Sequence, residues 1–298
     1  MLSRDLDYFV ALAGQGSFWR AAGALGLTPA ALSKSLRRLE STVEAQLMER
    51  SSRGLMLTSA GRLLLTKIGH LRLAADDLKR EMRDISVGRT GLLKIAVNQT
   101  ASEGLAAACM ALLQQAPHVT FQVHVANYDE MLSPLLAGDI ELGLSIRPEH
   151  VDSDLDSEVL FRDQFVVCAA RSHPLARRKR VELKALADQA WVLNSADALM
   201  PGLVRRAFRA AGLRPPHIVL ETRSLAVREA AHACSHTVGL QSRRMLRRAR
   251  ERYGLVELPV RELVHPVEFC AFYRRSGYLS RAARRLIDLL GTVVHWTR

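Results

Sequence analysis

The stretch of sequence that decides the fold at the amino end is residues 17–43, which read SFWRAAGALGLTPAALSKSLRRLESTV. Gly26 ends a first short helix, because glycine adopts the left-handed conformation at little cost. Thr28 and Pro29 begin a second helix, since this pair places an N-cap before a proline at the first helical position. Two helices joined by a tight turn that contains glycine are the helix-turn-helix pattern.

The residues around this motif predict the rest of a small helical core. Residues 2–13 carry apolar side chains at spacings of three and four, which buries one face of a helix. Ser17 is expected to be the N-cap of the helix over 18–25. The helix after the turn runs from residue 29 to about 43 and buries its leucines.

The outer face of the helix over 29–43 presents small and hydrogen-bonding side chains together. Small residues allow a helix to enter a major groove, while serine, lysine and arginine donate hydrogen bonds to phosphates and base edges. The residues on this face are Ala30, Ser33, Lys34 and Arg37, with Arg38 further round. A solvated basic helix face is the alternative, but the tight turn before the helix favours DNA binding.

A short basic hairpin follows this helix. Residues 47–50 and 55–57 alternate like two strands around the turn at 51–54. A hairpin in this place can reach an adjacent minor groove or a row of phosphates. The first 58 residues therefore predict a winged helix-turn-helix.

Residues 59–87 predict one long helix, which Thr58 and Ser59 can cap. Its apolar positions recur at alternating spacings of four and three residues, which is a heptad seam. The seam consists of Leu64, Ile68, Leu71, Ala75, Leu78, Met82 and Ile85. A long helix with one narrow apolar stripe needs a partner, so we expect a dimerisation helix. Packing of the stripe on the helix's own domain is the alternative.

Residues 88–91 contain two glycines, end the helical pattern and mark a boundary. Beyond them, strands and helices alternate for about 200 residues, which predicts a doubly wound α/β region. Strands are expected at 92–97, 119–125, 140–146, 158–170, 218–221, 238–241 and 267–273. Helices are expected at 102–115, 128–137, 199–211, 224–234, 242–252 and 279–294.

The composition is that of an ordinary globular protein of about two domains. The chain has 298 residues, 48% of them hydrophobic and 24% charged, which excludes the disordered class. The longest apolar run, 105–113, is too short to cross a bilayer. Asp5 and Asp7 interrupt the place where a secretory signal would need an apolar region, so we expect a cytoplasmic protein. The net charge of +12 favours an anionic partner, either nucleic acid or an acidic membrane surface.

No motif for catalysis or cofactor binding occurs in the sequence. The nucleophile elbow, the Walker loop, the dinucleotide fingerprint and the HExxH zinc motif are all absent. The four cysteines are isolated, and we expect them to be buried. They are Cys109, Cys168, Cys234 and Cys270. His232 and His236 are spaced for a metal but have no acidic third ligand nearby, so the α/β region is expected to bind a ligand without metal or cofactor rather than to be an enzyme.

The amino-terminal motifs resemble those of the LysR-type transcriptional regulators. The match is densest between residues 6 and 65, where many residues agree at fixed spacings. They are Leu6, Asp7, Tyr8, Phe9, Gly16, Ser17, Phe18, Ala21, Ala22, Leu25, Leu32, Ser33, Lys34, Leu39, Glu40, Leu47, Arg50, Arg53, Gly54, Leu57, Thr58, Ser59, Ala60 and Gly61. Beyond residue 91 the resemblance rests on the order of elements and on short signatures at 138–142, 166–175 and 238–240.

The resemblance implies three parts. Residues 1–58 would be a winged helix-turn-helix DNA-binding domain, 59–90 a linker helix that dimerises the chain, and 91–298 a periplasmic-binding-protein-like α/β regulatory region. The two subdomains of that region would comprise about 91–162 with 268–298, and about 163–267. The implied partners are double-stranded promoter DNA, a small-molecule effector between the subdomains, further copies of the chain in a homodimer and homotetramer, and RNA polymerase.

By position, the resemblance assigns DNA contacts to the recognition helix and to the wing. The implied DNA-binding residues are Thr28, Pro29, Ala30, Ser33, Lys34, Arg37 and Arg53. Pro29 stands where the family very often has glutamine, and proline offers no side-chain hydrogen bond to adenine. Glu44 is a second departure, because a glycine often ends this helix in the family. The proline at position 29 leads us to expect an altered operator preference.

The effector site should lie in loops at the carboxyl ends of strands, where open α/β sheets bind ligands. The candidate effector-binding residues are Asn98, Gln99, Thr100, Ser102, Ser145, Arg147, Ser195, Thr222 and Gln241. Backbone N–H groups and hydroxyls over 98–102, together with Arg147, suit a carboxylate. We therefore expect a small organic anion as effector. Each residue taken singly has an alternative role as a helix cap or a surface polar residue.

Two other classes of protein compete with an effector-responsive transcription factor. A solute-binding or catalytic α/β protein would not need the wing and the heptad helix. An architectural nucleoid protein would not need 200 residues after the boundary. The sequence leaves open the effector, the operator and the regulated genes, as well as the choice between activation and repression.

Overall fold

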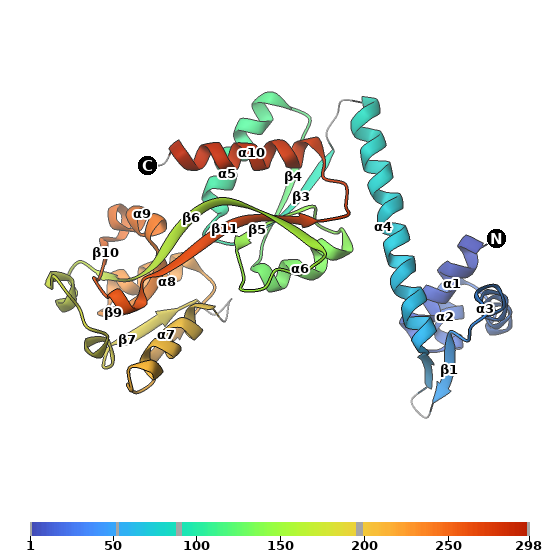
Figure 1. Cartoon of the computed structure of the whole chain (residues 1–298), viewed down its shortest axis with the longest axis horizontal. Helices are drawn as coiled ribbons and strands as arrows, with labels where there is room; N and C mark the ends of the chain where they lie inside the picture. The colour runs from blue at the N-terminus through green and yellow to red at the C-terminus, as the bar shows by residue number, and fades with distance from the viewer. Residues whose placement is uncertain (1, 52–53, 88–90, 195–198, 297–298) are drawn as a thin grey trace. The chain divides into compact units, whose positions relative to one another are not determined.

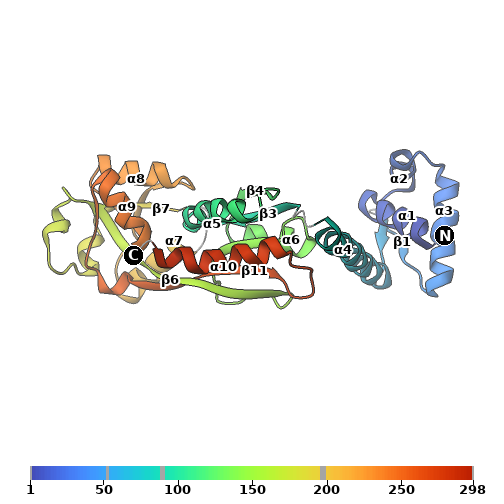
Figure 2. The same cartoon turned by 90° about the horizontal axis from the view of Figure 1, so that it is seen from above.

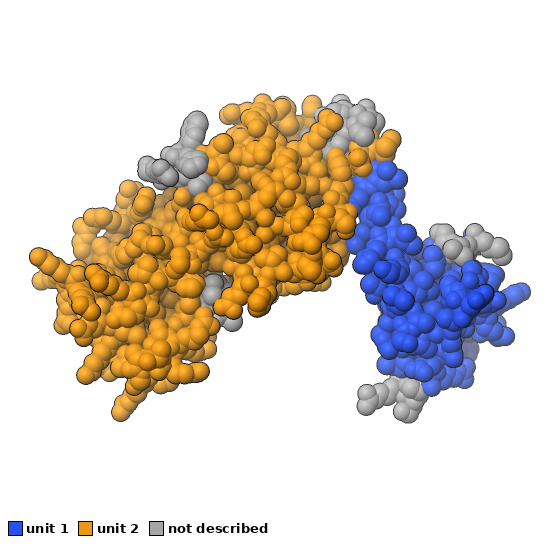
Figure 3. Space-filling view, viewed as in Figure 1, with its two compact units in different colours: residues 1–79 blue, residues 80–298 orange. Residues whose placement is uncertain are grey.

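The computed structural model describes residues 2–51, 54–87, 91–194 and 199–296. Its contacts divide the chain into two compact units, residues 1–79 and 80–298, which Figure 3 shows in two colours. Each unit has a hydrophobic core of its own. The predicted finer division into 1–58, 59–90 and 91–298, and of the last part into two subdomains, stays a prediction.

Unit 1 is the predicted winged helix-turn-helix. Its elements are α1 (Leu2–Gln15), α2 (Phe18–Leu25), α3 (Pro29–Val43), β1 (Met48–Ser51), β2 (Gly54–Leu57) and the first part of α4 (Ser59–Val87). The strands β1 and β2 pair antiparallel, with Met48 opposite Leu57. Phe9, Leu12 and Leu32 form the centre of the core. The expected helices and hairpin are all present, within two residues of the predicted ends.

The helix ends of unit 1 agree with the sequence except at one cap. Gly26 adopts a left-handed conformation with φ of 64°, and the Oγ1 of Thr28 accepts a hydrogen bond from the backbone N–H of Ala31 at 3.2 Å. Ser17 occupies the N-cap position of α2, but within the described chain its side chain accepts no capping bond. The predicted N-cap position of Ser17 and the start of the helix are therefore confirmed, although the Ser17 side chain does not cap the helix.

The long helix α4 uses its apolar seam in two ways. Near its start, Leu64 and Ile68 pack into the core of unit 1. Further along, the side chains of Leu71, Leu78 and Met82 are 65%, 58% and 53% exposed in the single chain. The first part of the seam thus follows the alternative of packing on its own domain, and the later part is left open for a partner.

Unit 2 is built on one mixed sheet. Its strands are β3 (Leu92–Val97), β4 (Thr120–Val125), β5 (Leu142–Ile146), β6 (Leu155–Ala170), β7 (Ala190–Leu193), β8 (His217–Glu221), β9 (Thr237–Ser242), β10 (Leu255–Glu257) and β11 (His265–Arg274). Their order is β4-β3-β5-β11-β6-β9-β7-β8, with β10 paired to β6. Strands β3, β4 and β5 are parallel, as are β7, β8 and β9. The long strands β6 and β11 run antiparallel between these two groups, as Figures 1 and 2 show.

Helices cover both faces of this sheet. They are α5 (Ser102–Gln115), α6 (Tyr128–Ala137), α7 (Leu199–Ala210), α8 (Leu225–Cys234), α9 (Arg243–Tyr253) and α10 (Arg281–Trp296). Figure 1 shows α5, α6 and α10 around the β3–β4–β5 end, and α7, α8 and α9 around the other end. The alternation along β6 explains the layers, because Val167 faces the main core with α5, α7 and α10, whereas Val166 and Cys168 face the cluster under α9.

Two strands and a cysteine depart from the sequence-based expectations. β7 and β10 were not predicted, because each is a run of only three or four residues, too short to show a period. Cys234 is exposed, whereas the other three cysteines are buried as expected. In the part of the chain that the structure describes, no helix combines the length and apolar character that a membrane crossing requires.

Candidate nucleic-acid interface and ligand pocket

The recognition helix α3 exposes the residues that the sequence assigned to DNA. Thr28, Ala30, Lys34 and Arg37 are exposed, and Pro29 and Ser33 are half-buried at the same face. The opposite face of α3 buries its leucines in the core. The guanidinium of Arg37 donates to the hydroxyl of Ser33 at 3.3 Å, so the two side chains lie together at the surface. Arg53 lies outside the described residues.

A buried carboxylate fixes α3 against α1. The side chain of Asp5 is only 4% exposed; it accepts a hydrogen bond from the Ser35 hydroxyl at 2.6 Å and one from the Arg38 Nε at 2.8 Å. The Arg38 guanidinium holds the pKa of Asp5 below its ordinary value. Sequence reasoning placed Arg38 at the edge of the DNA face. In the structure, Arg38 instead orients the recognition helix.

The wing is held at a defined place beside α3. The carboxylate of Glu40 accepts hydrogen bonds from the backbone N–H groups of Leu47 and Met48, at 2.8 and 3.3 Å. At the start of α4, a Cβ on Gly61 would lie 2.1 Å from the carbonyl oxygen of Leu47, so only glycine fits there. These contacts join the recognition helix, the wing and α4 into one body.

In unit 2, residues from both groups of parallel strands meet at one small pocket, here called the central pocket. Its volume is 30 Å³. The lining comprises Asn98, Gln99, Thr100, Ile146, Phe165, Asn194, Met200, Leu225, Arg228, Leu240, Gln241, Ser242 and Met245. Asn98, Gln99 and Thr100 follow β3, whereas Arg228 and Gln241 come from α8 and β9. The lining thus contains both polar and apolar side chains.

Four of the predicted effector residues line this pocket, and others lie elsewhere. Asn98, Gln99, Thr100 and Gln241 belong to the lining, while Ser102, Ser145, Arg147 and Thr222 do not. Ser195 lies outside the described residues.

Each predicted residue outside the lining has a local role. The Ser102 hydroxyl donates to the carbonyl oxygen of Gln99 at 2.6 Å, and the Thr222 hydroxyl accepts from the backbone N–H of Ser224. Ser145 is buried within β5. Arg147 lies 3.6 Å from the carboxylate of Glu268.

The sequence missed the cation of the central pocket. Arg228 donates through Nη1 to the side-chain oxygen of Asn194 at 3.1 Å and to the carbonyl oxygen of Thr222 at 3.1 Å. Its neighbour in the lining, Gln241, donates to the carboxylate of Glu229 at 2.8 Å. Recognition of β7 would have pointed to Asn194, because that residue follows the carboxyl end of the strand.

One side-chain contact joins the half of unit 2 built on β3, β4 and β5 to the half built on β7, β8 and β9. Asn98 donates to the side-chain oxygen of Asn127 at 2.6 Å within the first half, and Glu130, on the first turn of α6, pairs with Arg223 from the other half. The Arg223 guanidinium holds the pKa of Glu130 below its ordinary value. This ion pair joins the two halves next to the pocket, because Arg228 of the lining donates to the carbonyl oxygen of Arg223 at 3.4 Å.

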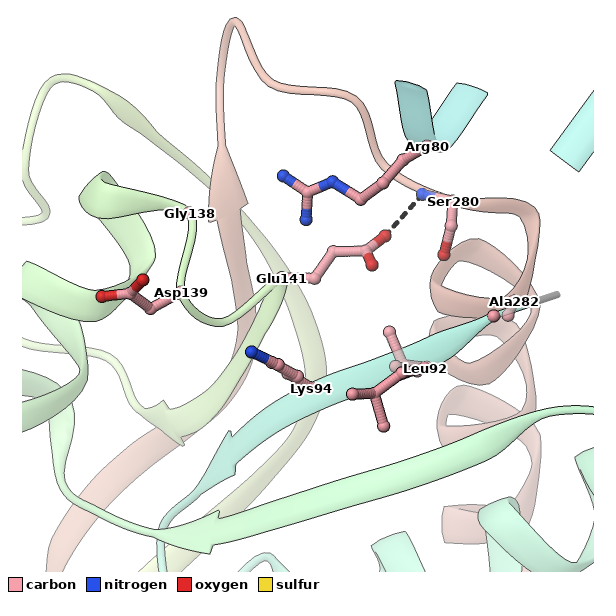
Figure 4. Close-up of a pocket in the computed structure, with 10 residues that line it drawn as sticks. Arg80, Leu92, Lys94, Gly138, Asp139, Glu141, Ser280 and Ala282 are labelled. Atoms are coloured by element: carbon pink, nitrogen blue, oxygen red, sulfur yellow. Dashed lines mark hydrogen bonds between the residues drawn. The ribbon is translucent and has the colours of Figure 1, made fainter. Parts of the chain in front are cut away.

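A larger pocket lies at the start of β3 and contains none of the predicted residues. Its volume is 250 Å³, and Figure 4 shows Arg80, Lys94, Asp139 and Glu141 around it. The Glu141 carboxylate accepts a hydrogen bond from the backbone N–H of Ser280 at 2.6 Å, which fixes the start of α10. Charges of both signs line this pocket, so it favours no one class of ligand.

The fold and these two sites define a DNA-binding regulator with an α/β ligand-binding region. The family model of the bacterial regulatory helix-turn-helix proteins of the lysR family matches residues 3–62. The LysR substrate binding domain matches residues 86–294. The chain belongs to the LysR family of transcriptional regulators.

Individual relatives agree with this assignment. The chain is 28% identical to the uncharacterised regulator YnfL of Escherichia coli over 63% of its own length, and it spans 64% of that relative. It is 28% identical to the RuBisCO operon transcriptional regulator of Allochromatium vinosum, over 94% of the chain and 92% of that protein. Full-length CbnR, solved with its target DNA, shares the fold with a TM-score of 0.58 at 20% identity, over 97% of this chain and 99% of CbnR.

Proposed function

We propose that this chain is an effector-responsive transcription factor that reads promoter DNA through α3 and the wing. It acts in the cytoplasm, and its response is set by a small organic anion bound in the central pocket. The observation that carries the proposal is that both groups of parallel strands meet at one polar pocket holding Arg228. Loops at the carboxyl ends of parallel strands are the usual ligand site of open α/β sheets.

The chemistry of the central pocket favours an anion with an apolar body. Arg228 presents a planar set of donors that matches a carboxylate, and Asn98 and Gln241 add polar atoms beside it. Phe165, Leu225 and the remaining apolar lining suit a hydrocarbon portion. No cofactor is part of this proposal. The effector carboxylate would replace the neutral oxygens of Asn194 and Thr222 as a partner of Arg228.

Binding requires the two halves of unit 2 to separate. Ligand pockets usually enclose at least about 300 Å³, whereas the central pocket has 30 Å³. The strands β6 and β11 are the connections between the halves, so a small bend in them opens the pocket. A ligand that fits only the opened arrangement shifts the population toward it, and this shift is the proposed signal.

The oligomer proposed here is a homodimer formed through α4, paired further into a homotetramer. Exposed leucines at heptad spacing favour a second helix as partner. Two recognition helices in a dimer then read two half-sites of one promoter. RNA polymerase is the partner that the bound regulator would act upon.

The DNA-reading part is tested by gel shifts with the region upstream of the protein's own gene. Lys34→Ala and Arg37→Ala should each weaken binding, because each removes a donor to a phosphate or a base edge. Lys67→Ala, a change of the same kind on α4, is the control. If the wild-type protein binds the duplex and both α3 variants bind it equally well, α3 is not the helix that reads the DNA.

The effector part is tested by thermal shift with a panel of small organic acids and neutral sugars. A ligand that binds only the folded state raises the melting temperature, and we expect shifts with acids alone. Arg228→Met should abolish them and Arg228→Lys should weaken them, while Arg247→Met on the exposed face of α9 should leave them unchanged. A set of ligands consisting only of neutral sugars would overturn the proposed chemistry.

A further inference from the structure

The most exposed large apolar side chain in the described chain is on the DNA-binding unit. Trp19, in the first turn of α2, is 79% exposed. An indole has a large apolar surface and one N–H donor, and it usually finds a partner for both. A single exposed apolar side chain is ordinary on a protein surface, so the neighbours of Trp19 and its place in the fold carry the argument.

Trp19 contributes nothing to the core of unit 1. The buried residues of α2 are Ala21 and Ala22, which face α1 and α3. Trp19 shares the outer side of the helix with Arg20, Gly23 and Ala24, which are exposed as well. Because glycine and alanine leave the surface low beside the indole, a broad partner can approach this face closely.

The position of Trp19 relates it to the DNA-reading elements. Gly16, two residues before α2, accepts a hydrogen bond through its carbonyl oxygen from the backbone N–H of Leu55 in the wing, at 3.3 Å. The other end of α2 leads through Gly26 directly into α3. The helix that carries Trp19 therefore runs from a contact with β2 of the wing to the start of the recognition helix.

This placement identifies the partner by its chemistry. In helix-turn-helix proteins the recognition helix lies in the major groove and the preceding helix crosses the sugar–phosphate backbone. A backbone strand offers apolar deoxyribose surfaces and anionic phosphate oxygens side by side. Trp19 and Arg20 together offer an apolar ring, one neutral donor and one cationic donor, which complement those groups.

We propose that Trp19 and Arg20 form a backbone clamp on operator DNA. The indole packs on a deoxyribose and donates its N–H to a phosphate oxygen, while Arg20 pairs with a neighbouring phosphate. The clamp sets the orientation of α3 in the groove without reading sequence. The inference rests on operator binding by α3 and adds contacts outside that helix.

Tryptophan fluorescence tests the clamp directly. The full-length Trp296→Phe variant keeps Trp19 and the fully buried Trp191, so only Trp19 should respond to a partner. On titration with the upstream duplex we expect a shift of the exposed emission and protection from acrylamide quenching. Trp19→Phe in the same background should remove the response. Unchanged emission and quenching on a duplex that is demonstrably bound would overturn the proposal.

Binding measurements separate a backbone contact from base reading. Trp19→Ala should weaken binding to the upstream duplex and to an unrelated duplex by the same factor, about tenfold, because a backbone contact is common to both. Arg20→Ala should reduce the slope of log K against log salt by about 0.9 for the phosphate lost. Melting of unit 1 should be unchanged in both variants, since neither side chain is part of the core.

Two other results are distinguishable from these. If Trp19→Ala abolishes transcription while leaving both affinities intact, the partner of this face is a protein and the clamp is wrong. If the wild-type chain binds no duplex, or the Lys34 and Arg37 variants bind as the wild type does, the failure lies in the proposed DNA reading by α3. If the α3 variants lose binding and the Trp19 and Arg20 variants do not, the clamp is wrong while the proposed DNA reading by α3 stands.

Discussion

Glu44 is strained at the end of the recognition helix. It has φ of 52° and is the one non-glycine residue with positive φ in the described chain. A left-handed backbone with a Cβ costs roughly 1–2 kcal/mol. Glu44→Gly should therefore stabilise unit 1 by about 1 kcal/mol, which corresponds to about 4–8 °C in Tm for a unit of this size.

A second variant identifies the source of that strain. Glu44→Ala keeps the Cβ and should leave the Tm near that of the wild type, as circular dichroism melting would show. Equal stabilisation by alanine and glycine would mean that the carboxylate, and not the backbone conformation, is unfavourable at this position.

His232 makes the stability of unit 2 depend on pH. Its ring is buried against Gly239 and bonded to the Thr237 hydroxyl at 3.0 Å, and burial lowers its pKa to about 4. In the unfolded chain its pKa is near 6.5, so between these values only the unfolded state takes up the proton. Stability should fall as the pH drops from about 6.5 to about 4, by about 3 kcal/mol at most from this group.

Urea unfolding at several pH values, with variants, measures this effect. His232→Asn should flatten the decline relative to the wild type in that window, while His236→Asn, at an exposed neighbour, should not. A parallel decline in the wild type and His232→Asn would show that carboxylates alone account for the acid sensitivity.

Single residues also show where sequence reasoning succeeds and where it stops. Thr28 caps α3 and Gly26 ends α2 as predicted, because each acts through the neighbouring backbone. Arg38 and Arg228 were not predicted in their roles. Their partners, Asp5 and Asn194, lie 33 and 34 positions away, and no local pattern connects residues at that distance.

Among the elements, α4 carries a prediction about assembly. Leu71 and Leu78 lie on the open part of the heptad seam, and a second helix would bury them. Leu71→Lys with Leu78→Lys should give a monomer in sedimentation equilibrium and weaken operator binding. Leu63→Lys is the matched control, because Leu63 is also a leucine, 60% exposed, but lies about 100° round the helix from Leu64. A stable dimer in the double variant would exclude the seam as the interface.

The secondary structure of this chain was predictable where an element shows a period or a sustained apolar run. The helix α4 shows heptad spacing, α5 is rich in alanine and leucine, and β3 is a run of apolar residues. The strands β7, with four residues, and β10, with three, are too short to show either pattern. The antiparallel course of β6 and β11 was not predicted either, since strand direction depends on pairing partners far along the chain.

At the scale of the molecule, the net positive charge favoured DNA as a partner, although most of that charge lies outside the DNA-binding unit. Residues 1–79 contain 11 lysines and arginines against 7 acidic residues, a net charge of +4, whereas residues 163–267 contain 19 against 9, a net charge of +10. The overall excess of +12 therefore says little about α3. The helix-turn-helix spacing, and not the composition, was the informative evidence for DNA binding.

Two units with separate cores predict two separable thermal transitions. An upstream duplex binds unit 1 and should raise only the transition of that unit, whereas an organic acid that fits the central pocket should raise only that of unit 2. At a ligand concentration of 100 times Kd the stabilisation is about 2.7 kcal/mol, which corresponds to about 11–22 °C for unit 1 and about 5–11 °C for unit 2. Calorimetry with each ligand measures this. Arg228→Met should remove the shift by the acid and keep the shift by DNA, while Lys34→Ala with Arg37→Ala should do the reverse. One transition raised by both ligands would mean that the two units unfold as a single cooperative body.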